Sequence, residues 1–198
     1  MAAHQKGAIE RGGIFVFLDE SGFSLKPNVR RTWAPRGQTP ILTHCFNWQR
    51  AHAIGALACH PDGSACEVLL YVQEHPINKE TILAYLPALK EHLQQPVVLL
   101  WDGLPAHRSK DVAAFIAQNA EWLQVERFPG YAPELNPVEY LWSALKGKDL
   151  ANFCPDATLA LAERLQAGQE RIGQDQEILY GFLVGSTLYE QRTDRALT

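Results

Sequence analysis

The chain has 198 residues, 46% of them hydrophobic, which suits one globular domain with a buried core and room for a small appendage. A formal net charge of -4 excludes a protein whose whole surface binds nucleic acid, because such binding depends on neutralising phosphates with basic side chains. No apolar run is long enough to span a membrane, and the first residues lack the apolar segment of a secretory signal.

The first part of the chain predicts strands separated by one basic loop. Residues 14–22 form a β-branched and aromatic run that ends at a glycine, which is typical of a buried strand. Residues 26–40 are rich in proline, glycine and charge and predict a loop or an irregular hairpin arm. Two apolar runs between residues 50 and 74 flank Asp62 and Gly63, a hairpin signal, and predict paired antiparallel strands.

The next part alternates helices with strands. Apolar residues recur at helical spacing from 78 to 94, where Asn78 can cap the first turn. Residues 96–102 are almost continuously apolar and predict a central strand covered on both faces. A second helix with Ser109 as its cap follows, and then a strand within 122–129. This order predicts an α/β fold in which helices flank a mixed sheet of antiparallel hairpin strands plus parallel strands.

A capping signal starts the following helix. Asn136 suits the N-cap, Pro137 the first helical position and Glu139 the third, which together make a capping box. One apolar stripe follows, made of Val138, Leu141, Trp142 and Leu145. Glu139 is rotated by about 100° from the start of that stripe, so it lies at the border between core and solvent, where it can face the edge of a sheet.

Three carboxylates could form a site, although each also has a structural explanation. Asp19 lies near the end of the first strand, on the face of Phe15 and Phe17. Asp102 ends the central strand, where a carboxylate beside apolar sequence needs a partner or a metal, yet such aspartates often only support a turn. The capping box alone would explain Glu139. Two strand-end aspartates with one helix-borne glutamate are nevertheless typical of phosphoryl transfer with two divalent cations.

Five stretches of the sequence carry a family resemblance. They are FLDESGFSL at 17–25, RRTWAPRGQTP at 30–40, LLWDGLPAHRS at 99–109, PGYAPELNPVEYLWSALK at 129–146 and LANFCPD at 150–156. In content and order they resemble the DDE transposases of the RNase H-like superfamily, and more closely the mariner-related insertion-sequence-630 family. The resemblance therefore implies an RNase H-like mixed sheet flanked by helices.

The resemblance also implies which acids carry the chemistry. By motif position, the family's catalytic and metal-binding acids fall on Asp19, Asp102 and Glu139, and the 37 positions from Asp102 to Glu139 are close to the family's spacing. Glu134 has no such match, so Glu139 is the expected ligand. Many members carry Asn where this chain has Gly103, so either a hydrogen bond behind the site is lost or the turn is tighter.

The implied activity is that of a transposase catalytic domain. Metal-dependent cleavage of DNA by water would be followed by attack of the freed 3′-hydroxyl on target DNA, with two Mg²⁺ or Mn²⁺ ions held by the three acids. Composition alone favours a solvated loop for the basic strip, but the resemblance implies DNA contacts from Lys26, Arg30, Arg31, Trp33 and Arg36. His107 is expected either at a DNA phosphate or as an ordinary turn residue. The alternatives are another RNase H-like nuclease, of the RNase H or resolvase type, or an inactive transposase remnant that acts as a binding module.

The expected organisation is a catalytic domain at 1–150 and a helical extension packed on it at 151–198, where apolar residues recur at helical spacing. The family's helix-turn-helix region does not fit in the eighteen residues before Asp19. We therefore expect an isolated catalytic domain that binds transposon ends and target DNA, as a possible homodimer and with a possible separate helix-turn-helix chain. The expected setting is the bacterial cytoplasm, at the nucleoid, with the four cysteines as reduced thiols.

Overall fold

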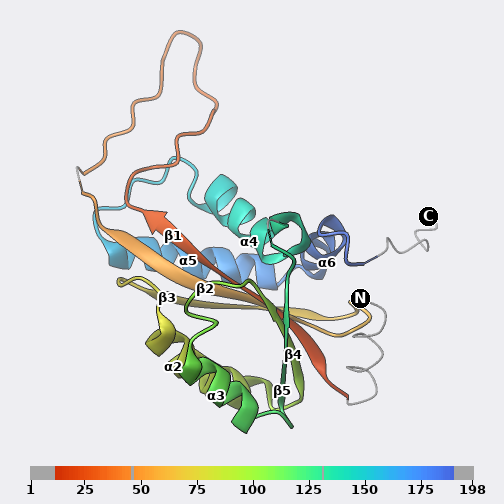
Figure 1. Cartoon of the computed structure of the whole chain (residues 1–198). Helices are drawn as coiled ribbons and strands as arrows, with labels where there is room; N and C mark the ends of the chain where they lie inside the picture. The colour runs from red at the N-terminus through yellow and green to blue at the C-terminus, as the bar shows by residue number, and fades with distance from the viewer. Residues whose placement is uncertain (1–11, 46, 131, 190–198) are drawn as a thin grey trace, which may run out of the picture.

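The computed structural model describes residues 12–45, 47–130 and 132–189, which form a five-stranded sheet between two layers of helices (Figure 1). The strands are β1 (Ile14–Ser24), β2 (Arg50–Cys59), β3 (Cys66–Gln73), β4 (Val97–Trp101) and β5 (Leu123–Arg127). They lie in the order β3-β2-β1-β4-β5. The pairs β1–β2 and β2–β3 are antiparallel, whereas β1–β4 and β4–β5 are parallel, so the predicted mixed sheet is confirmed.

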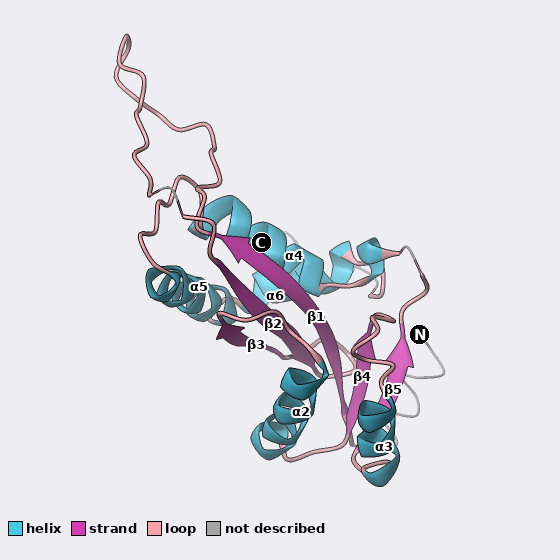
Figure 2. Cartoon of the chain, turned by 60° about the vertical axis from the view of Figure 1, so that its left-hand side comes forward, coloured by secondary structure: helices cyan, strands magenta, loops and turns pink. Residues whose placement is uncertain are grey.

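The helices divide between the two faces of the sheet (Figures 1 and 2). One face is covered by α2 (Lys79–Leu93) and α3 (Lys110–Gln118). The other is covered by α4 (Val138–Ala144), α5 (Thr158–Gly173) and α6 (Gln176–Gly185). A short 3-10 turn, η1 (Pro133–Leu135), precedes α4, and a π-helical turn, η2 (Leu145–Asp149), continues it.

Strand alternation gives the molecule two hydrophobic clusters. Phe15 and Phe17 of β1 are buried against α4, α5 and α6, while Val16 and Leu18 are buried against α2 and α3. All five residues of β4 are buried, because helices cover both faces of the sheet there. Consecutive residues of β1 therefore point into different hydrophobic clusters, one on each face of the sheet.

Both predicted helix caps in the first layer are present. Asn78 Oδ1 accepts the Thr81 backbone N–H at 2.9 Å, and Ser109 Oγ accepts the Val112 N–H at 3.3 Å. The first strand runs two residues beyond the predicted end, because it continues to pair with β2 as far as Ser24 opposite Arg50. The two strands around the predicted hairpin turn also pair as expected.

The connection between β1 and β2 projects away from the body (Figures 1 and 2). We call residues 26–45 and 47–49 the arm. Its side chains are largely exposed, and Trp33 is 100% exposed. Such a segment cannot contribute to the hydrophobic core, and it exposes Trp33 and several basic side chains to solvent.

The C-terminal helices belong to the core on the α4 side. Leu161, Leu165 and Ile172 of α5, with Leu179 and Leu183 of α6, lie in the same cluster as the phenylalanines of β1. The predicted boundary at residue 150 remains a prediction, and the expected structure of residues 1–11 and 190–198 lies outside the described residues. No helix of the described ranges is long and apolar enough to cross a membrane. All four cysteines are free thiols.

Candidate active site

One cleft of 630 Å³ is lined by all three predicted acids. Asp19 comes from β1, Asp102 follows the last residue of β4, and Glu139 lies in the first turn of α4. Because β1 and β4 are parallel neighbours, Asp19 and Asp102 reach the same edge of the sheet. Glu134 does not line this cleft, although it borders a neighbouring hollow together with Glu139.

The Asp19 carboxylate is held in a half-buried position on the α4 side of the sheet. Trp142 Nε1–H donates to its Oδ2 at 2.7 Å. Gly55 of β2 lies opposite Asp19 in the sheet, and a Cβ there would come within 2.4 Å of the Trp142 ring. The missing side chain at Gly55 therefore leaves the space in which the indole reaches Asp19.

The ionised form of Asp19 is unfavourable in this cleft. Burial raises the pKa of the Asp19 carboxyl to about 7; the hydrogen bond from Trp142 opposes this shift, and the negative charges of Glu139 and Glu20 add to it. Asp19 and Glu139 line the same cleft. A nearby cation would reverse this balance and favour the ionised carboxylates.

The capping box at the start of α4 is only half formed. Asn136 Oδ1 accepts the Val138 backbone N–H at 3.1 Å, so the asparagine does cap the helix. The reciprocal bond to Glu139 is replaced, because the Asn136 backbone N–H donates to the Pro133 carbonyl oxygen. Asn136 Nδ2 also donates to the Leu18 carbonyl oxygen at 3.3 Å, which ties the helix start to β1 beside Asp19. Glu139 is exposed at the cleft rather than used as a cap.

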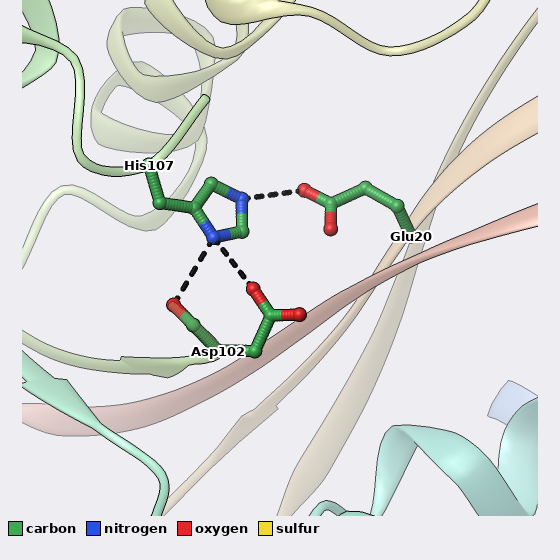
Figure 3. A group of neighbouring side chains, drawn as sticks. All are labelled: Glu20, Asp102 and His107. Atoms are coloured by element: carbon green, nitrogen blue, oxygen red, sulfur yellow. Dashed lines mark hydrogen bonds and ion pairs between the residues drawn. The ribbon is translucent and has the colours of Figure 1, made fainter. Parts of the chain in front are cut away.

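A buried histidine orients Asp102 (Figure 3). His107 is 2% exposed, and its ring stacks on Trp101 at a centroid distance of 4.0 Å. Its Nδ1 lies 2.9 Å from Asp102 Oδ1 and its Nε2 lies 2.8 Å from Glu20 Oε1. The Leu104 backbone N–H donates to Asp102 Oδ1 at 3.0 Å. The second Asp102 carboxylate oxygen points away from the ring (Figure 3), so one oxygen is fixed and the other is left for the cleft.

Both ring nitrogens of His107 face oxygen acceptors, which favours the imidazolium form. Burial alone lowers the pKa of His107, but the hydrogen bond and charge of Glu20, together with Asp102, outweigh burial and raise the pKa of this histidine. Both ring nitrogens thus have partners inside the protein, and a contact between His107 and a DNA phosphate stays a prediction. Glu20 was not among the predicted site residues, yet alternation along the first strand places it on the buried face of Leu18, where an acid needs a partner.

Two groups of side chains share Asp102. One consists of the three acids that line the cleft, whose ligand atoms, among the described residues, do not all come within 4.8 Å of one another. The other consists of Glu20, Asp102 and His107, which offer ligand atoms within 4.8 Å of one another. In that second group Glu20 contacts Nε2 and Asp102 contacts Nδ1 of the same ring, so the imidazole already bridges the two carboxylates. Its contacts are those of a hydrogen-bonded support for Asp102.

The predicted DNA-binding residues, apart from His107, lie on the arm. Lys26, Arg30, Arg31, Trp33 and Arg36 are all exposed. The Arg30 backbone N–H donates to Asn152 Oδ1 at 2.8 Å, which links the arm to the segment after η2. Whether these side chains contact DNA stays a prediction.

Comparison with known proteins agrees with this arrangement. The family described as "DDE superfamily endonuclease" matches residues 14–157. No curated protein matches the chain. Among solved structures, a crystal structure of the Mos1 strand transfer complex has a TM-score of 0.65 at 20% identity, and covers 92% of this chain and 53% of that one. The Mos1 mariner paired end complex with Mn gives 0.64 at 19% identity, with 92% and 54% covered.

The isolated catalytic domain of Mos1 mariner transposase is also similar, with a TM-score of 0.52 at 14% identity, and covers 96% of this chain and 91% of that one. These likenesses establish the RNase H-like fold that the sequence predicted. The chain spans about half the length of the Mos1 chains in the two complexes.

Proposed function

Because the chain belongs to the DDE superfamily of endonucleases, we propose that it is the catalytic domain of a transposase of the mariner-related type. Its reactions would be metal-dependent cleavage of DNA strands and strand transfer into target DNA. The observation that carries this proposal is the single cleft at the sheet edge that is lined by Asp19, Asp102 and Glu139. These residues are the proposed catalytic acids and metal ligands.

The donor set of the cleft fits divalent cations. Three carboxylates line one cleft, and the negative charge of Glu139 raises the pKa of Asp19. Hard cations such as Mg²⁺ and Mn²⁺ prefer such oxygen ligands. When bound, two such ions supply a Lewis acid for the scissile phosphate and an activated water. We propose Mg²⁺ or Mn²⁺ as the cofactor, with two ions.

The protein's own side chains would set the geometry of this site. Trp142 holds Asp19 from the α4 side, and His107 with Glu20 holds Asp102 from the opposite side. Such supporting contacts fix the orientation of ligands and commonly matter nearly as much as the ligands. The exposed cations of the arm would contact phosphates, which positions DNA without reading its sequence.

The proposed partners are transposon-end and target DNA. The similar Mos1 structures are described as strand transfer and paired end complexes, which supports this choice for the present chain without testing it. A homodimer, a separate helix-turn-helix chain and a setting at the bacterial nucleoid in the cytoplasm belong to the same proposal.

Nicking of a supercoiled plasmid in Mn²⁺ tests the function. Glu139→Gln should lower the nicking rate by more than about a hundredfold, since even the outer contacts of metal ligands are typically worth 10- to 100-fold. Glu134→Gln is the matched control, because this exposed residue lies outside the cleft, and it should keep most of the activity. Equal losses in both variants would refute the assignment of Glu139.

A substrate panel separates the proposed reaction from its alternatives. A transposase domain should nick duplex DNA that carries transposon ends and join the new 3′ ends to target DNA. Preferred cleavage of an RNA–DNA hybrid or of a four-way junction would instead indicate an RNase H or a resolvase. A parent protein that binds DNA but does not nick any of these substrates in Mn²⁺ or Mg²⁺ would identify an inactive binding module.

A further inference from the structure

Two of the four cysteines face each other across the hairpin that β2 and β3 form. Cys59 is the last residue of β2 and Cys66 is the first residue of β3, and the two are partners in the antiparallel register. The other two cysteines lie elsewhere, Cys45 on the arm and Cys154 between η2 and α5. The hairpin therefore brings one pair of thiols together.

The hydrogen bonds around this pair place the two side chains close to each other. The His60 backbone N–H donates to the Ala65 carbonyl oxygen at 2.8 Å, so the adjacent pair, on the side of the turn, is hydrogen-bonded. The Cys66 backbone points away from β2, because its N–H donates to Gln176 Oε1 at 2.9 Å and its carbonyl oxygen accepts Gln176 Nε2 at 2.8 Å. The two kinds of pair alternate along an antiparallel ladder, so Cys59 and Cys66 form a non-hydrogen-bonded pair, whose Cα atoms lie about 4.5 Å apart.

This spacing suits a disulfide bond. Disulfides usually join residues whose Cα atoms are about 4.4–6.8 Å apart. The two thiols already interact: burial raises the pKa of the Cys59 thiol, and its side-chain hydrogen bond with Cys66 raises that pKa further. A bond between the two sulfurs is therefore compatible with the backbone as it stands.

Both thiols are protected by the C-terminal part of the fold. Cys59 is 1% exposed and Cys66 is 8% exposed, and both belong to the hydrophobic cluster of α5 and α6. Tyr189, which follows α6, belongs to the same cluster, and its ring lies 3.4 Å from the position of a Cβ at Gly63 in the hairpin turn. Tyr189 thus packs over this end of the hairpin, and a reagent reaches the thiols when this region opens locally.

We propose that Cys59 and Cys66 are a reversible disulfide site, which a low-molecular-weight disulfide such as oxidised glutathione oxidises when the hairpin end opens beneath Tyr189. Cys66, the more exposed of the two, attacks one sulfur of the small disulfide and releases one thiol. Cys59 then attacks the Cys66 sulfur and releases the second thiol. Each cysteine gives its proton to the thiolate that leaves, so two protein thiols lose two electrons and the small disulfide is reduced to two thiols.

The site is independent of the proposed activity of the cleft. Cys59 pairs with Phe15 at the beginning of β1, whereas Asp19 pairs with Gly55 further along both strands. The disulfide would close the hairpin at the last strand pair before the turn. A cross-link restricts the unfolded chain more than a folded hairpin that is already closed, so oxidation should stabilise the protein.

The test uses the folded protein with Cys45→Ser and Cys154→Ser, so that only the proposed pair can react. After incubation with an excess of oxidised glutathione, the protein is denatured, treated with iodoacetamide and weighed by mass spectrometry. The expected product has lost two hydrogen atoms, takes up no iodoacetamide and yields a peptide in which Cys59 is linked to Cys66. Two alkylated cysteines, or a lasting glutathione adduct, would overturn the proposal.

Single substitutions test the order of the steps and the cover. In Cys59→Ala the attack that resolves the adduct is lost, so glutathione should accumulate on Cys66, whereas Cys66→Ala should react more slowly. Tyr189→Ala should increase the rate of disulfide formation about fivefold or more, because less of the fold has to open. Tyr71→Ala is the matched control, since Tyr71 is an exposed tyrosine of the same strand as Cys66 and should leave the rate unchanged. Equal rates for the two tyrosine variants would refute opening beneath Tyr189.

Urea unfolding of the oxidised and reduced forms measures the effect of the bond on the fold. The oxidised form should have the higher midpoint, and dithiothreitol should return it to the midpoint of the reduced form. A lower midpoint after oxidation would show that the bond distorts the hairpin, and would overturn the proposal of a site that the fold prepares for a disulfide.

Discussion

Asp19 and Glu20 are consecutive on β1 but face opposite layers of the protein. Asp19 faces α4, where an indole N–H donates to it and the charge of Glu139 adds to the effect of burial, so that its pKa is raised to about 7. Glu20 faces the other layer. Burial raises the pKa of Tyr85 in α2 on that side, and the charge of Glu20 raises it further. His107 Nε2 lies 2.8 Å from Glu20 Oε1.

The difference shows how one strand can supply both a ligand and its support. Among the described residues no positive charge lowers the pKa of Asp19, so a cation from outside would favour its ionised form. Glu20 is matched by an internal imidazole, so its charge is used within the fold to hold Asp102. A two-residue period separates these roles, because neighbouring strand residues point to opposite faces.

The largest expected effect concerns the cost of ionising Asp19 without metal. The folded state keeps a proton on this carboxyl up to about pH 7, whereas the unfolded chain loses it near 3.8. The unfolded state therefore binds fewer protons at Asp19 between these values, so the contribution of this carboxyl to the free energy of unfolding falls as pH rises from about 4 to 7. Asp19→Asn keeps an acceptor for Trp142 but cannot ionise. The free energy of unfolding of this variant should therefore exceed that of the parent by an amount that grows over this range to a few kcal/mol and then stays constant.

Urea unfolding in EDTA at a series of pH values would measure this difference. Asp156→Asn is the control, because Asp156 is exposed. The difference in free energy of unfolding between this variant and the parent should not follow the pH dependence expected for Asp19→Asn. If the Asp19→Asn difference is as flat as that of the control, Asp19 ionises freely in the folded state, and the contrast with Glu20 is lost.

A smaller effect is expected on the Glu20 side of the sheet. Glu20→Ala removes the acceptor that holds His107 Nε2, so Asp102 should lose its fixed orientation and the nicking rate in Mn²⁺ should fall about 10- to 100-fold. Glu20→Gln keeps an oxygen acceptor and should recover most of the rate. If Glu20→Gln recovers the rate while both variants have the same melting temperature, Glu20 has a positioning role. If both variants are as active as the parent, Glu20 plays no part in the site.

The sequence identified the residues whose roles follow from local patterns. Asn78 and Ser109 cap helices through bonds to residues three positions away, and alternation assigned Asp19 to the face of Phe15 and Phe17. The three acids were found from strand ends, from a cap signal and from family motifs. The mixed sheet followed from the order of elements, because hairpin strands and crossover helices leave different spacings in the sequence.

The contacts that were not predicted join residues far apart in the sequence. Glu20 meets His107 at a separation of 87 positions, and Lys146 meets Ser21 at a separation of 125. Trp142 was assigned to an apolar stripe, and its core position is correct, but its N–H bond to Asp19 depends on the space left by Gly55. The capping box was half wrong because a nearer acceptor, the Pro133 carbonyl oxygen, takes the Asn136 N–H.

The smallest expected effect is metal-induced stabilisation, which distinguishes the two faces of the sheet directly. Metal that binds only the folded state, at ten times its dissociation constant, should add about 1.4 kcal/mol, or roughly 3–6 °C in melting temperature for a chain of this size. The ions are expected on the Asp19 side, so Asp19→Asn should lose most of this Mn²⁺ shift and Glu20→Gln should keep most of it. Asp102→Asn should lose it in either case, because Asp102 belongs to both groups. The opposite result, a shift kept by Asp19→Asn and lost by Glu20→Gln, would place the ion among Glu20, Asp102 and His107, and would make the histidine a ligand rather than a support.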